Sequence, residues 1–385
     1  MLNHLFDWLQ ELGVHIPGAG LFHFLSFRAM LAAVFSMLIA YFAGGKMIKL
    51  LRKEQIGEDI RDLGLEGQMQ KKGTPTMGGL IIIAAVLGSA LLVCRLDSVY
   101  TLLLVVTTLW CGAIGFADDY IKVFKHNKEG MSPRGKLILQ FGLGLFVALT
   151  VCLSPSIPTD RLVTTIPFVK AHEFDYSWLS PFRGQLGVYC SWGIYMLMII
   201  LVTLGCSNGT NLTDGMDGLA AGTSAIVGVA LGVMAWLSGD ALDARYLNIM
   251  HIPGAGEVAI YLAAFVGALL GFLWYNTFPA QVFMGDTGSL TIGGVIGVSA
   301  VLIRKELLLP ILCGIFVMES LSVIIQRTYF KHTKKKYGEG RRVFLMAPLH
   351  HHYQKQGIPE PRIVVRFWMI GIILAVSTLA LLKIR

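Results

Sequence analysis

The residues best suited to chemistry lie in the stretch 208–219, whose sequence is NGTNLTDGMDGL. Almost wholly apolar runs flank it at 187–205 and 220–237. Carboxylates close to hydrocarbon are costly, so a polar cluster here favours a functional site, and its glycines let the backbone approach a ligand closely. A polar loop with helix caps is the alternative. The candidates for ligand contacts are Asn211, Asp214 and Asp217, and the two aspartates share a face if the segment is a helical turn.

Two adjacent carboxylates, Asp118 and Asp119, end another apolar run in the sequence FADDYIK. Lys122 follows Asp118 by four residues, so both side chains face the same way on a helix. Mg²⁺ typically takes one or two carboxylates together with substrate phosphates, and a nearby lysine adds positive charge for the phosphates. The motif predicts a site for Mg²⁺ and phosphate, with an ion pair at a helix end as the alternative.

A further acidic residue, Asp286, stands among glycines in the sequence NTFPAQVFMGDTGS at 276–289. A carboxylate flanked by glycines suits a metal ion that must approach the backbone closely. Phe283 either stacks on a nucleotide base or packs under the loop. Asn276 is either a ligand contact or a helix-end cap.

Basic residues and histidines form two more candidate sites for anions. The sequence KKGTPTMGG at 71–79 precedes an apolar run, and a glycine-bearing helix start can bind an anion with Lys72 beside it. Three consecutive histidines, His350, His351 and His352, follow a proline near the C-terminal end. Neighbouring histidines do not easily share one tetrahedral zinc ion, so we expect one or two of them to contact phosphate or sugar.

The elements that must position these residues are transmembrane helices. Hydrophobic residues make up 55% of the 385 residues and charged residues 15%, against roughly 25% charged in a soluble domain. A spanning helix needs about 20 apolar residues. The sequence therefore predicts an all-α polytopic membrane protein, a single domain over 1–385, with ten transmembrane helices. We expect these at 23–45, 76–94, 99–117, 135–153, 187–206, 219–237, 257–274, 288–304, 306–327 and 363–383.

The distribution of basic residues predicts the orientation of these helices. Of the 32 Lys and Arg residues, 21 fall in or at the edge of the loops that are cytoplasmic if both termini are periplasmic, as the positive-inside rule requires. Every motif described above then lies at the cytoplasmic face, where five loops would build one site. The long periplasmic loop 154–184 contains four prolines and alternating apolar residues, which is compatible with a short hairpin.

Together the motifs resemble those of the phospho-N-acetylmuramoyl-pentapeptide transferase family, the lipid I synthases of peptidoglycan assembly. The resemblance implies a Mg²⁺-dependent enzyme of the bacterial inner membrane. Such an enzyme transfers phospho-MurNAc-pentapeptide from UDP-MurNAc-pentapeptide to undecaprenyl phosphate, giving lipid I and UMP. The motifs that carry the resemblance run through nearly the whole chain in the family's order: KKGTPTMGG (71–79), FADDYIK (116–122), SPRGKL (132–137), NLTDGMDGL (211–219), WYNTFPAQVFMGDTGSL (274–290) and RRVFLMAPLHHHYQ (341–354).

The same resemblance implies roles for individual residues. Asp286 is implied to be a Mg²⁺ ligand, and Asp118 and Asp119 to be essential acids near the lipid phosphate. The residues implied around the nucleotide are Lys72, Asp214, Asp217, Asn276 and Phe283. Those implied around the diphosphate are Lys122, Lys136, Asn211, His350, His351 and His352. A homodimer in membrane lipid is expected, with no nucleic-acid partner.

Two other functions compete with this interpretation. A sister transferase that uses UDP-GlcNAc shares the acidic motifs. An ion or solute transporter would use the carboxylates as coupling sites, but the chain shows no internal repeat of the kind that many transporters have.

Overall fold

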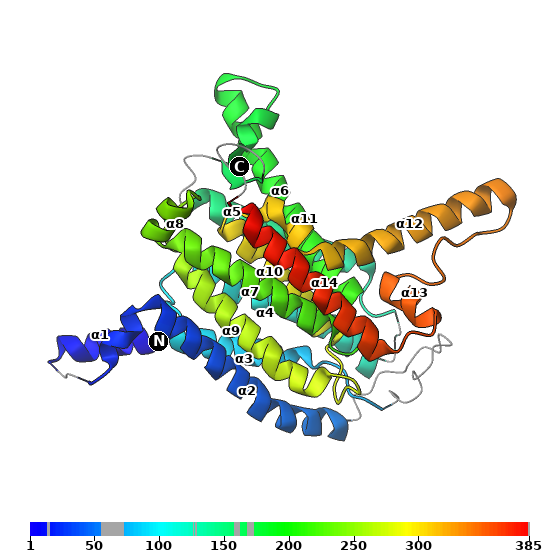
Figure 1. Cartoon of the computed structure of the whole chain (residues 1–385), viewed down its shortest axis with the longest axis horizontal. Helices are drawn as coiled ribbons and strands as arrows, with labels where there is room; N and C mark the ends of the chain where they lie inside the picture. Colours follow the sequence, from blue (N-terminus) through cyan, green and yellow to red (C-terminus); the bar gives the residue numbers. More distant parts are fainter. Residues whose placement is uncertain are drawn as a thin grey trace.

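The computed structural model describes residues 1–13, 16–54, 73–125, 127, 129–157, 162–167 and 173–383, and Lys72 lies outside these ranges. The described part is almost entirely helical (Figure 1). Its longer helices are α1 (Leu2–Glu11), α2 (Leu25–Lys53), α3 (Gly79–Val93), α4 (Val99–Phe124), α5 (Pro133–Leu153), α6 (Gly184–Thr213), α7 (Leu219–Gly239), α9 (Ala255–Asn276), α10 (Gly285–Leu302), α12 (Gly314–Tyr337) and α14 (Glu360–Leu381). The shorter elements are η1 (Ala19–His23), β1 (Val163–Thr165), β2 (Glu173–Asp175), η3 (Tyr176–Leu179), α8 (Ala241–Leu247), η4 (Glu306–Leu308), α11 (Leu309–Leu312) and α13 (Leu349–Lys355).

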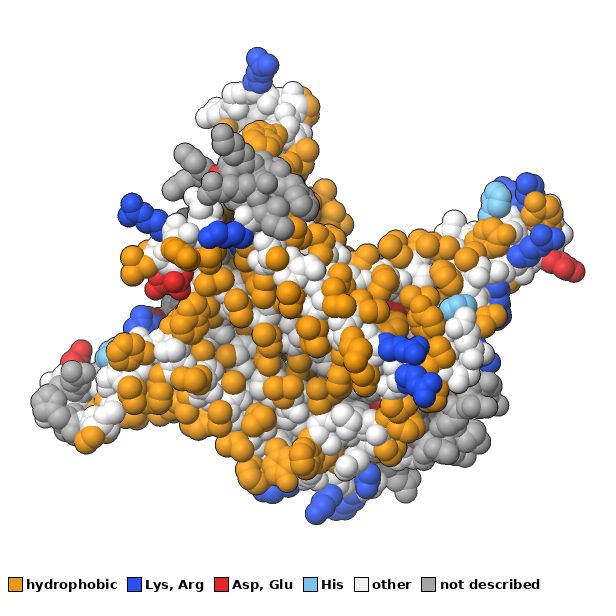
Figure 2. Space-filling view, in the orientation of Figure 1, with side chains coloured by type: hydrophobic (Ala, Val, Ile, Leu, Met, Phe, Trp, Pro, Cys, Tyr) orange, Lys and Arg blue, Asp and Glu red, His pale blue; other side chains and the backbone are white. Residues whose placement is uncertain are grey.

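Eight of the described helices are long and apolar enough to cross a membrane. They are α2, α4, α5, α6, α7, α9, α10 and α14, and each begins or ends within a few residues of a predicted span or extends beyond it. The face in Figure 2 is mostly hydrophobic, with Lys and Arg side chains gathered at its edges. The chain is therefore an all-α polytopic membrane protein, as the composition predicted.

Two predicted spans take a different form. The span predicted at 306–327 is broken: η4 and α11 precede α12, and the two parts meet at an angle of 76°. The chain turns at Cys313, and α12 then projects away from the bundle (Figure 1). The span predicted at 76–94 contains only the 15 residues of α3. Its first residues are not helical because their backbone pairs with the segment before α10, as described below.

Helix α10 lies at the centre of the bundle. Every residue from Thr287 to Leu302 is buried, and α4, α6 and α3 pack around the helix. Small residues allow this close approach: a Cβ added at Gly79 on α3 would overlap the backbone of Gly288. Because α10 is held on several sides, the residues at its N-terminus have a fixed position relative to the ends of α4 and α6.

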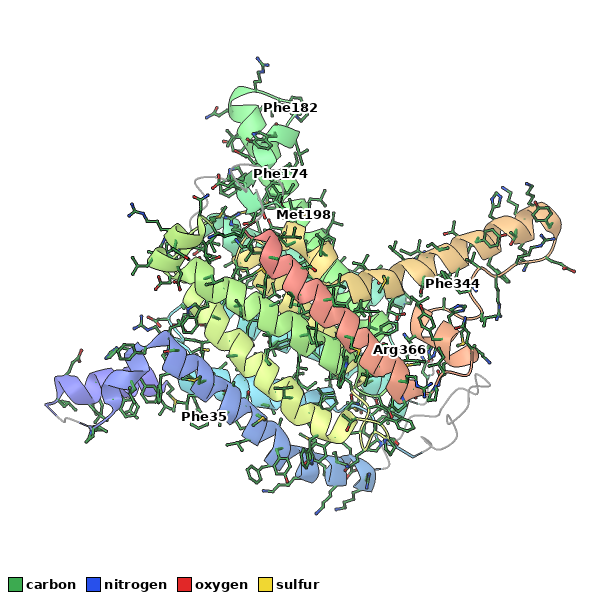
Figure 3. All side chains as sticks on the ribbon, in the orientation of Figure 1. Phe35, Phe174, Phe182, Met198, Phe344 and Arg366 are labelled. Carbon is green, nitrogen blue, oxygen red and sulfur yellow. The ribbon has the colours of Figure 1, made fainter. Side chains whose placement is uncertain are left out.

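The loop 154–184 contains the predicted hairpin in its described part. Strands β1 and β2 pair antiparallel, and Phe174 in β2 lies near the end of the molecule where α6 begins (Figure 3). The hairpin is anchored to the far end of α10, because Thr164 Oγ1 and the Thr165 N–H both donate to the Arg304 carbonyl, at 3.1 and 3.0 Å. This anchor is at the opposite end of α10 from Asp286.

Candidate active site

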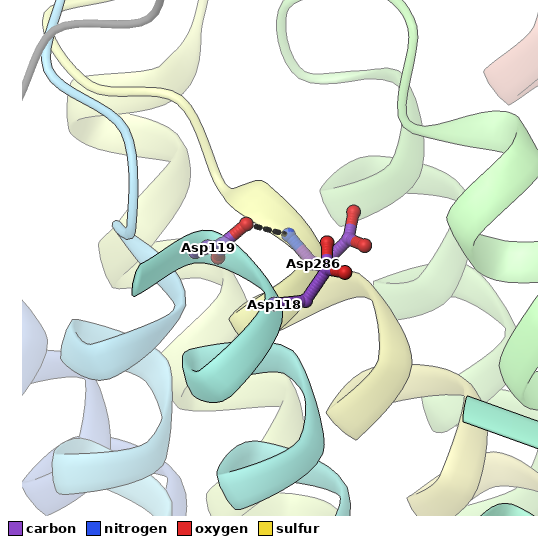
Figure 4. Close-up of side chains that lie close together, drawn as sticks. All are labelled: Asp118, Asp119 and Asp286. Atoms are coloured by element: carbon purple, nitrogen blue, oxygen red, sulfur yellow. Dashed lines mark hydrogen bonds between the residues drawn. The ribbon is translucent and has the colours of Figure 1, made fainter. Parts of the chain in front are cut away.

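Three carboxylates meet where α4 ends and α10 begins. Asp118 and Asp119 lie near the C-terminal end of α4, and Asp286 is the second residue of α10 (Figure 4). One oxygen from each of the three lies within 4.8 Å of the others. The structure thus brings together the two acidic motifs that are 167 residues apart in the sequence.

Two lysines bridge Asp118 and Asp286. Lys122 Nζ lies 2.7 Å from Asp118 Oδ2 and 3.3 Å from Asp286 Oδ2, so Asp118 and Lys122 face the same way, as the four-residue spacing predicted, and form the ion pair that the sequence left as the alternative. Lys136 Nζ, from the first turn of α5, lies 2.8 Å from Asp118 Oδ1 and 2.6 Å from Asp286 Oδ2. Both lysines are partly exposed, so a phosphate arriving from solution could reach their ammonium groups.

The last turns of α6 complete the surroundings of Asp286. Asn211 Nδ2 donates to Asp286 Oδ1 at 2.9 Å and to Ser289 Oγ at 2.9 Å. The amide therefore fixes the orientation of the Asp286 carboxylate on one side, while the lysines hold its other oxygen. Asn211 contacts a predicted metal ligand here, and the sequence-based role near the diphosphate stays a prediction.

Asp119 has a different environment from its neighbour. Its carboxylate accepts hydrogen bonds from the N–H groups of Asp286 and Thr287, at 3.1 and 2.9 Å, and from Thr287 Oγ1 at 2.6 Å. These N–H groups belong to the first turn of α10 and have no partner within the helix. Gly285 precedes them with φ of +72°, and a Cβ there would come within 2.6 Å of the Asp119 carboxylate. Asp119 caps α10 from another helix.

We expect Asp119→Ala to lower the free energy of unfolding by about 2 kcal/mol, the upper range for losing a helix cap. The change leaves two buried donors of Thr287 and the partly buried Asp286 N–H without their acceptor, and each such donor carries a penalty. Asp119→Asn keeps one acceptor oxygen and should lose less. Thermal unfolding of the purified variants in detergent checks this, with the exposed Glu339→Ala as the control. An unfolding temperature of Asp119→Ala equal to wild type would contradict the capping role.

The segment 73–79 is held beside the site by backbone hydrogen bonds. The Phe283 N–H donates to the Pro75 carbonyl, and the Gly78 and Gly79 N–H groups donate to the Phe283 and Met284 carbonyls, each at 2.8 Å. The pairing places the end of the KKGTPTMGG motif directly against the loop that carries Asp286. Phe283 itself is half-buried.

The stretch 208–219 is divided between a helix and a turn. Helix α6 ends at Thr213, and a non-helical turn runs to Gly218 at φ of +77°. Asp214 and Asp217 therefore do not share a helical face, contrary to the expectation for a helical turn. Asp217 Oδ2 accepts from the Ala280 N–H at 3.0 Å, and the Asp217 N–H donates to Glu360 Oε1 at 2.7 Å.

Asn276 joins this turn to the loop that follows α9. Its Oδ1 accepts from the Gly218 N–H at 3.0 Å, and its Nδ2 donates to the Val282 carbonyl at 2.9 Å. These contacts are those of a helix-end residue, one of the two roles that the sequence left open.

The three histidines point to different places. His350 is fully buried against Glu319 of α12. His351 Nδ1 lies 3.2 Å from Gln354 Oε1, and His352 Nδ1 accepts from the Leu345 N–H at 3.1 Å. The rings of His350 and His351 lie 4.2 Å apart between their centroids, whereas His352 turns toward Leu345.

Several residues that shape the site were missed in the sequence. Thr287 and Ser289 lie inside the GDTGS motif, so their proximity to Asp286 was a signal for them. The indication for Glu319 was that it is a carboxylate in the apolar first half of α12. Glu360 is the first residue of α14 and gave no comparable signal.

The carboxylates fit a hard divalent cation. Mg²⁺ prefers oxygen ligands and usually keeps one or two carboxylates with several waters. Asp118 and Asp286 supply such oxygens, and the buried Asp118 Oδ2 has Lys122 Nζ at 2.7 Å as its charged neighbour, a place that a divalent cation could share. Asp119 is already engaged by α10, so Asp118 and Asp286 are the better candidates for ligands.

Comparisons with known proteins show which family the chain is similar to. A family model described as glycosyl transferase family 4 matches residues 101–304, and a phospho-N-acetylmuramoyl-pentapeptide-transferase signature matches residues 71–83. A phospho-N-acetylmuramoyl-pentapeptide-transferase of Parabacteroides distasonis is 54% identical over 421 aligned residues. Proteins with the same name from Porphyromonas gingivalis and Flavobacterium psychrophilum are 52% and 50% identical. The alignments cover 100% of both chains in each case.

Proposed function

The chain belongs to the phospho-N-acetylmuramoyl-pentapeptide-transferase family, and from this premise we propose its substrates, metal and sidedness. It transfers phospho-MurNAc-pentapeptide from UDP-MurNAc-pentapeptide to undecaprenyl phosphate, and the products are lipid I and UMP. The active site faces the cytoplasm, at the boundary of the inner membrane. This is the first membrane step of peptidoglycan synthesis.

One observation carries the proposal: two lysines and two carboxylates interlock at the ends of membrane-length helices. Both proposed substrates are anionic and one is a lipid, so their phosphates must meet where apolar helices end. Phosphoryl transfer needs positioning and electrostatic stabilisation more than covalent chemistry. Lys122 and Lys136 supply positive charge for this purpose, and Asp118 and Asp286 hold the two ammonium groups in place.

Asp118 and Asp286 would hold Mg²⁺, with Asn211 orienting Asp286 through the 2.9 Å hydrogen bond. When bound, the metal supplies Lewis-acid stabilisation of phosphoryl oxygens. Asp119 would not bind the metal itself. It fixes the N-terminus of α10 and so the position of Asp286.

The donor nucleotide would lie against the turn 214–218 and the loop 276–284. Asp214, Asp217 and Phe283 are the candidates for contacts with uridine, and Lys72 for contacts with the phosphates. His351 and His352 are partly exposed on α13 and are the candidates for contacts with the diphosphate or sugar.

The attacking group would be the phosphate of the polyprenyl carrier, whose oxygen displaces UMP from the β-phosphorus of the donor. A new P–O bond forms to the lipid phosphate, and the P–O bond to UMP breaks with its electrons leaving on UMP. The second pKa of such a phosphate is about 6, so at cytosolic pH the nucleophile is mostly a dianion already. Little proton transfer is required of the protein.

We further propose that both termini are periplasmic and that ten segments cross the membrane, with α3 and the bent pair η4–α11 and α12 as the two shorter or broken crossings. The positive-inside bias supports this sidedness. A homodimer is proposed from the family resemblance alone.

The test is the release of UMP by inverted membrane vesicles that contain the protein. We expect release that requires UDP-MurNAc-pentapeptide, undecaprenyl phosphate and Mg²⁺ together. Right-side-out vesicles should be inactive, because the donor does not cross the membrane. Conversion of UDP-GlcNAc instead would show the sister transferase, and solute uptake without substrate conversion would show a transporter.

A further inference from the structure

A buried carboxylate on α12 contacts the first residue of the histidine cluster. Glu319 and His350 are both fully buried, at 0% relative exposure. Glu319 Oε2 lies 3.1 Å from His350 Nδ1, and Glu319 Oε1 accepts from the His350 backbone N–H at 3.2 Å. One carboxylate therefore holds both the side chain and the backbone of His350 at the start of α13.

The opposite edge of the His350 ring faces the turn 214–218. A Cβ added at Gly215 would overlap His350 Nε2, so the imidazole lies directly against this backbone. His350 Nε2 is buried and has no hydrogen-bond partner among the described residues. Gly215 itself is exposed, so it separates His350 from the surface where a ligand would bind.

Helix α12 also binds the segment 341–348, which precedes α13, through Gln326. Gln326 Oε1 accepts from the N–H groups of Val343 and Phe344, and Gln326 Nε2 donates to the Phe344 carbonyl, each at 3.0 Å. Phe344 lies between α12 and α13 (Figure 3). The Arg341 N–H also donates to Thr333 Oγ1 of α12 at 2.8 Å, so the segment 341–352 is attached to α12 through Glu319, Gln326 and Thr333. Of these, the attachment at Glu319 is the one that continues through His350 to the turn.

We propose that Glu319 is a positioning residue for the donor site, which acts through His350 on the turn 214–218. The inference rests on the proposed function, which places the nucleotide against that turn. Glu319 does not touch the substrate, and in this structure His350 does not either, since it lies beneath Gly215. Glu319 and His350 together fix the position and orientation of the turn that carries Asp214 and Asp217.

A carboxylate suits this role for two physical reasons. Its charged oxygen Oε2 lies 3.1 Å from His350 Nδ1 without the geometry of a hydrogen bond, so it attracts that edge of the ring electrostatically while Nε2 faces the turn. Burying a carboxylate without partners also costs free energy. Movement of His350 away from Glu319 would incur this cost, so the carboxylate favours the observed position of His350.

The first test is Glu319→Gln in the full-length protein, which keeps the size of the side chain but not its charge. We expect the KM for UDP-MurNAc-pentapeptide to rise about tenfold, within the range for losing a partner that orients a functional histidine. The KM for undecaprenyl phosphate should stay within about twofold by the same reasoning. Ser322→Ala is the matched control, because Ser322 is buried on the same helix and donates only to the Glu319 backbone carbonyl.

A double-mutant cycle tests whether Glu319 acts through His350. We expect Glu319→Gln combined with His350→Gln to raise the donor KM no further than His350→Gln alone, since residues in one network are not additive. Multiplied effects, or equal rises in the KM of both substrates, would overturn the proposal.

A readout that needs no turnover separates this inference from the proposed function. In protein labelled with ¹⁵N-histidine, the signal lost in His350→Gln identifies the His350 ring, and Glu319→Gln should shift that signal because it removes the charge 3.1 Å from Nδ1. If Glu319→Gln does not fold, Gly215→Ala displaces the same ring and should shift the same signal. A His350 signal that neither change moves would refute the positioning role, whatever substrate the enzyme uses.

Discussion

Asp286→Asn is expected to reduce UMP release by at least about 10³-fold, the loss seen when a single electrostatic contact to a transition state is removed. The substitution keeps the shape of the side chain and an oxygen for the hydrogen bond from Asn211, but it removes the charge that faces Lys122 and Lys136. It also removes a proposed Mg²⁺ ligand. The dependence of residual activity on Mg²⁺ concentration should therefore shift to higher concentration.

Steady-state rates over a range of Mg²⁺, together with thermal unfolding in detergent, measure this effect. Ser299→Ala is a suitable control because Ser299 is buried on the same helix, 13 residues and roughly 20 Å further along it. That variant should keep wild-type activity. Near-normal turnover of Asp286→Asn at low Mg²⁺ would remove Asp286 from the metal site.

Asp118→Asn should lose about 10²- to 10³-fold in rate, again by analogy with single electrostatic contacts, and raising the pH should not restore it. Both oxygens of Asp118 are occupied: Oδ1 accepts from the Met131 N–H at 2.7 Å and contacts Lys136, and Oδ2 contacts Lys122. A carboxylate held in this way orients cations. It is poorly placed to remove a proton, and the lipid phosphate needs little proton removal.

The pH profile decides between these roles. If Asp118 were a general base, the variant would recover between about pH 6 and 9, because the phosphate dianion then forms unaided. If Asp118 positions Lys122 and the metal, recovery should come with added Mg²⁺ and not with pH. A phosphorylated enzyme formed from donor alone, with UMP released before lipid is added, would instead indicate a covalent intermediate.

The sequence predicted features that depend on neighbouring residues. The apolar runs gave most of the long helices, and the four-residue spacing gave the Lys122–Asp118 pair. The loop prolines and alternation gave the hairpin of β1 and β2. In each case the physical cause, such as burial of an apolar run or helical periodicity, acts within about 20 residues.

Contacts between distant segments were beyond this reasoning. Nothing local shows that Asp119 caps α10 or that Glu319 holds His350, since both require helices from separate parts of the chain to meet. The short α3 has the same origin, because residues before Gly79 gain backbone partners from the loop 282–284 and so leave the helix.

The burial of α10 has a consequence for how the enzyme responds to its membrane. Helices α2, α5, α6 and α14 leave most of their apolar stretches uncovered by protein, whereas 89% of the apolar stretch of α10 is buried. A change in bilayer thickness acts on lipid-facing helices by altering their tilt. Asp286 belongs to a helix that is covered by other helices. Its position should therefore stay the same when the lipid-facing helices change their tilt in bilayers of different composition.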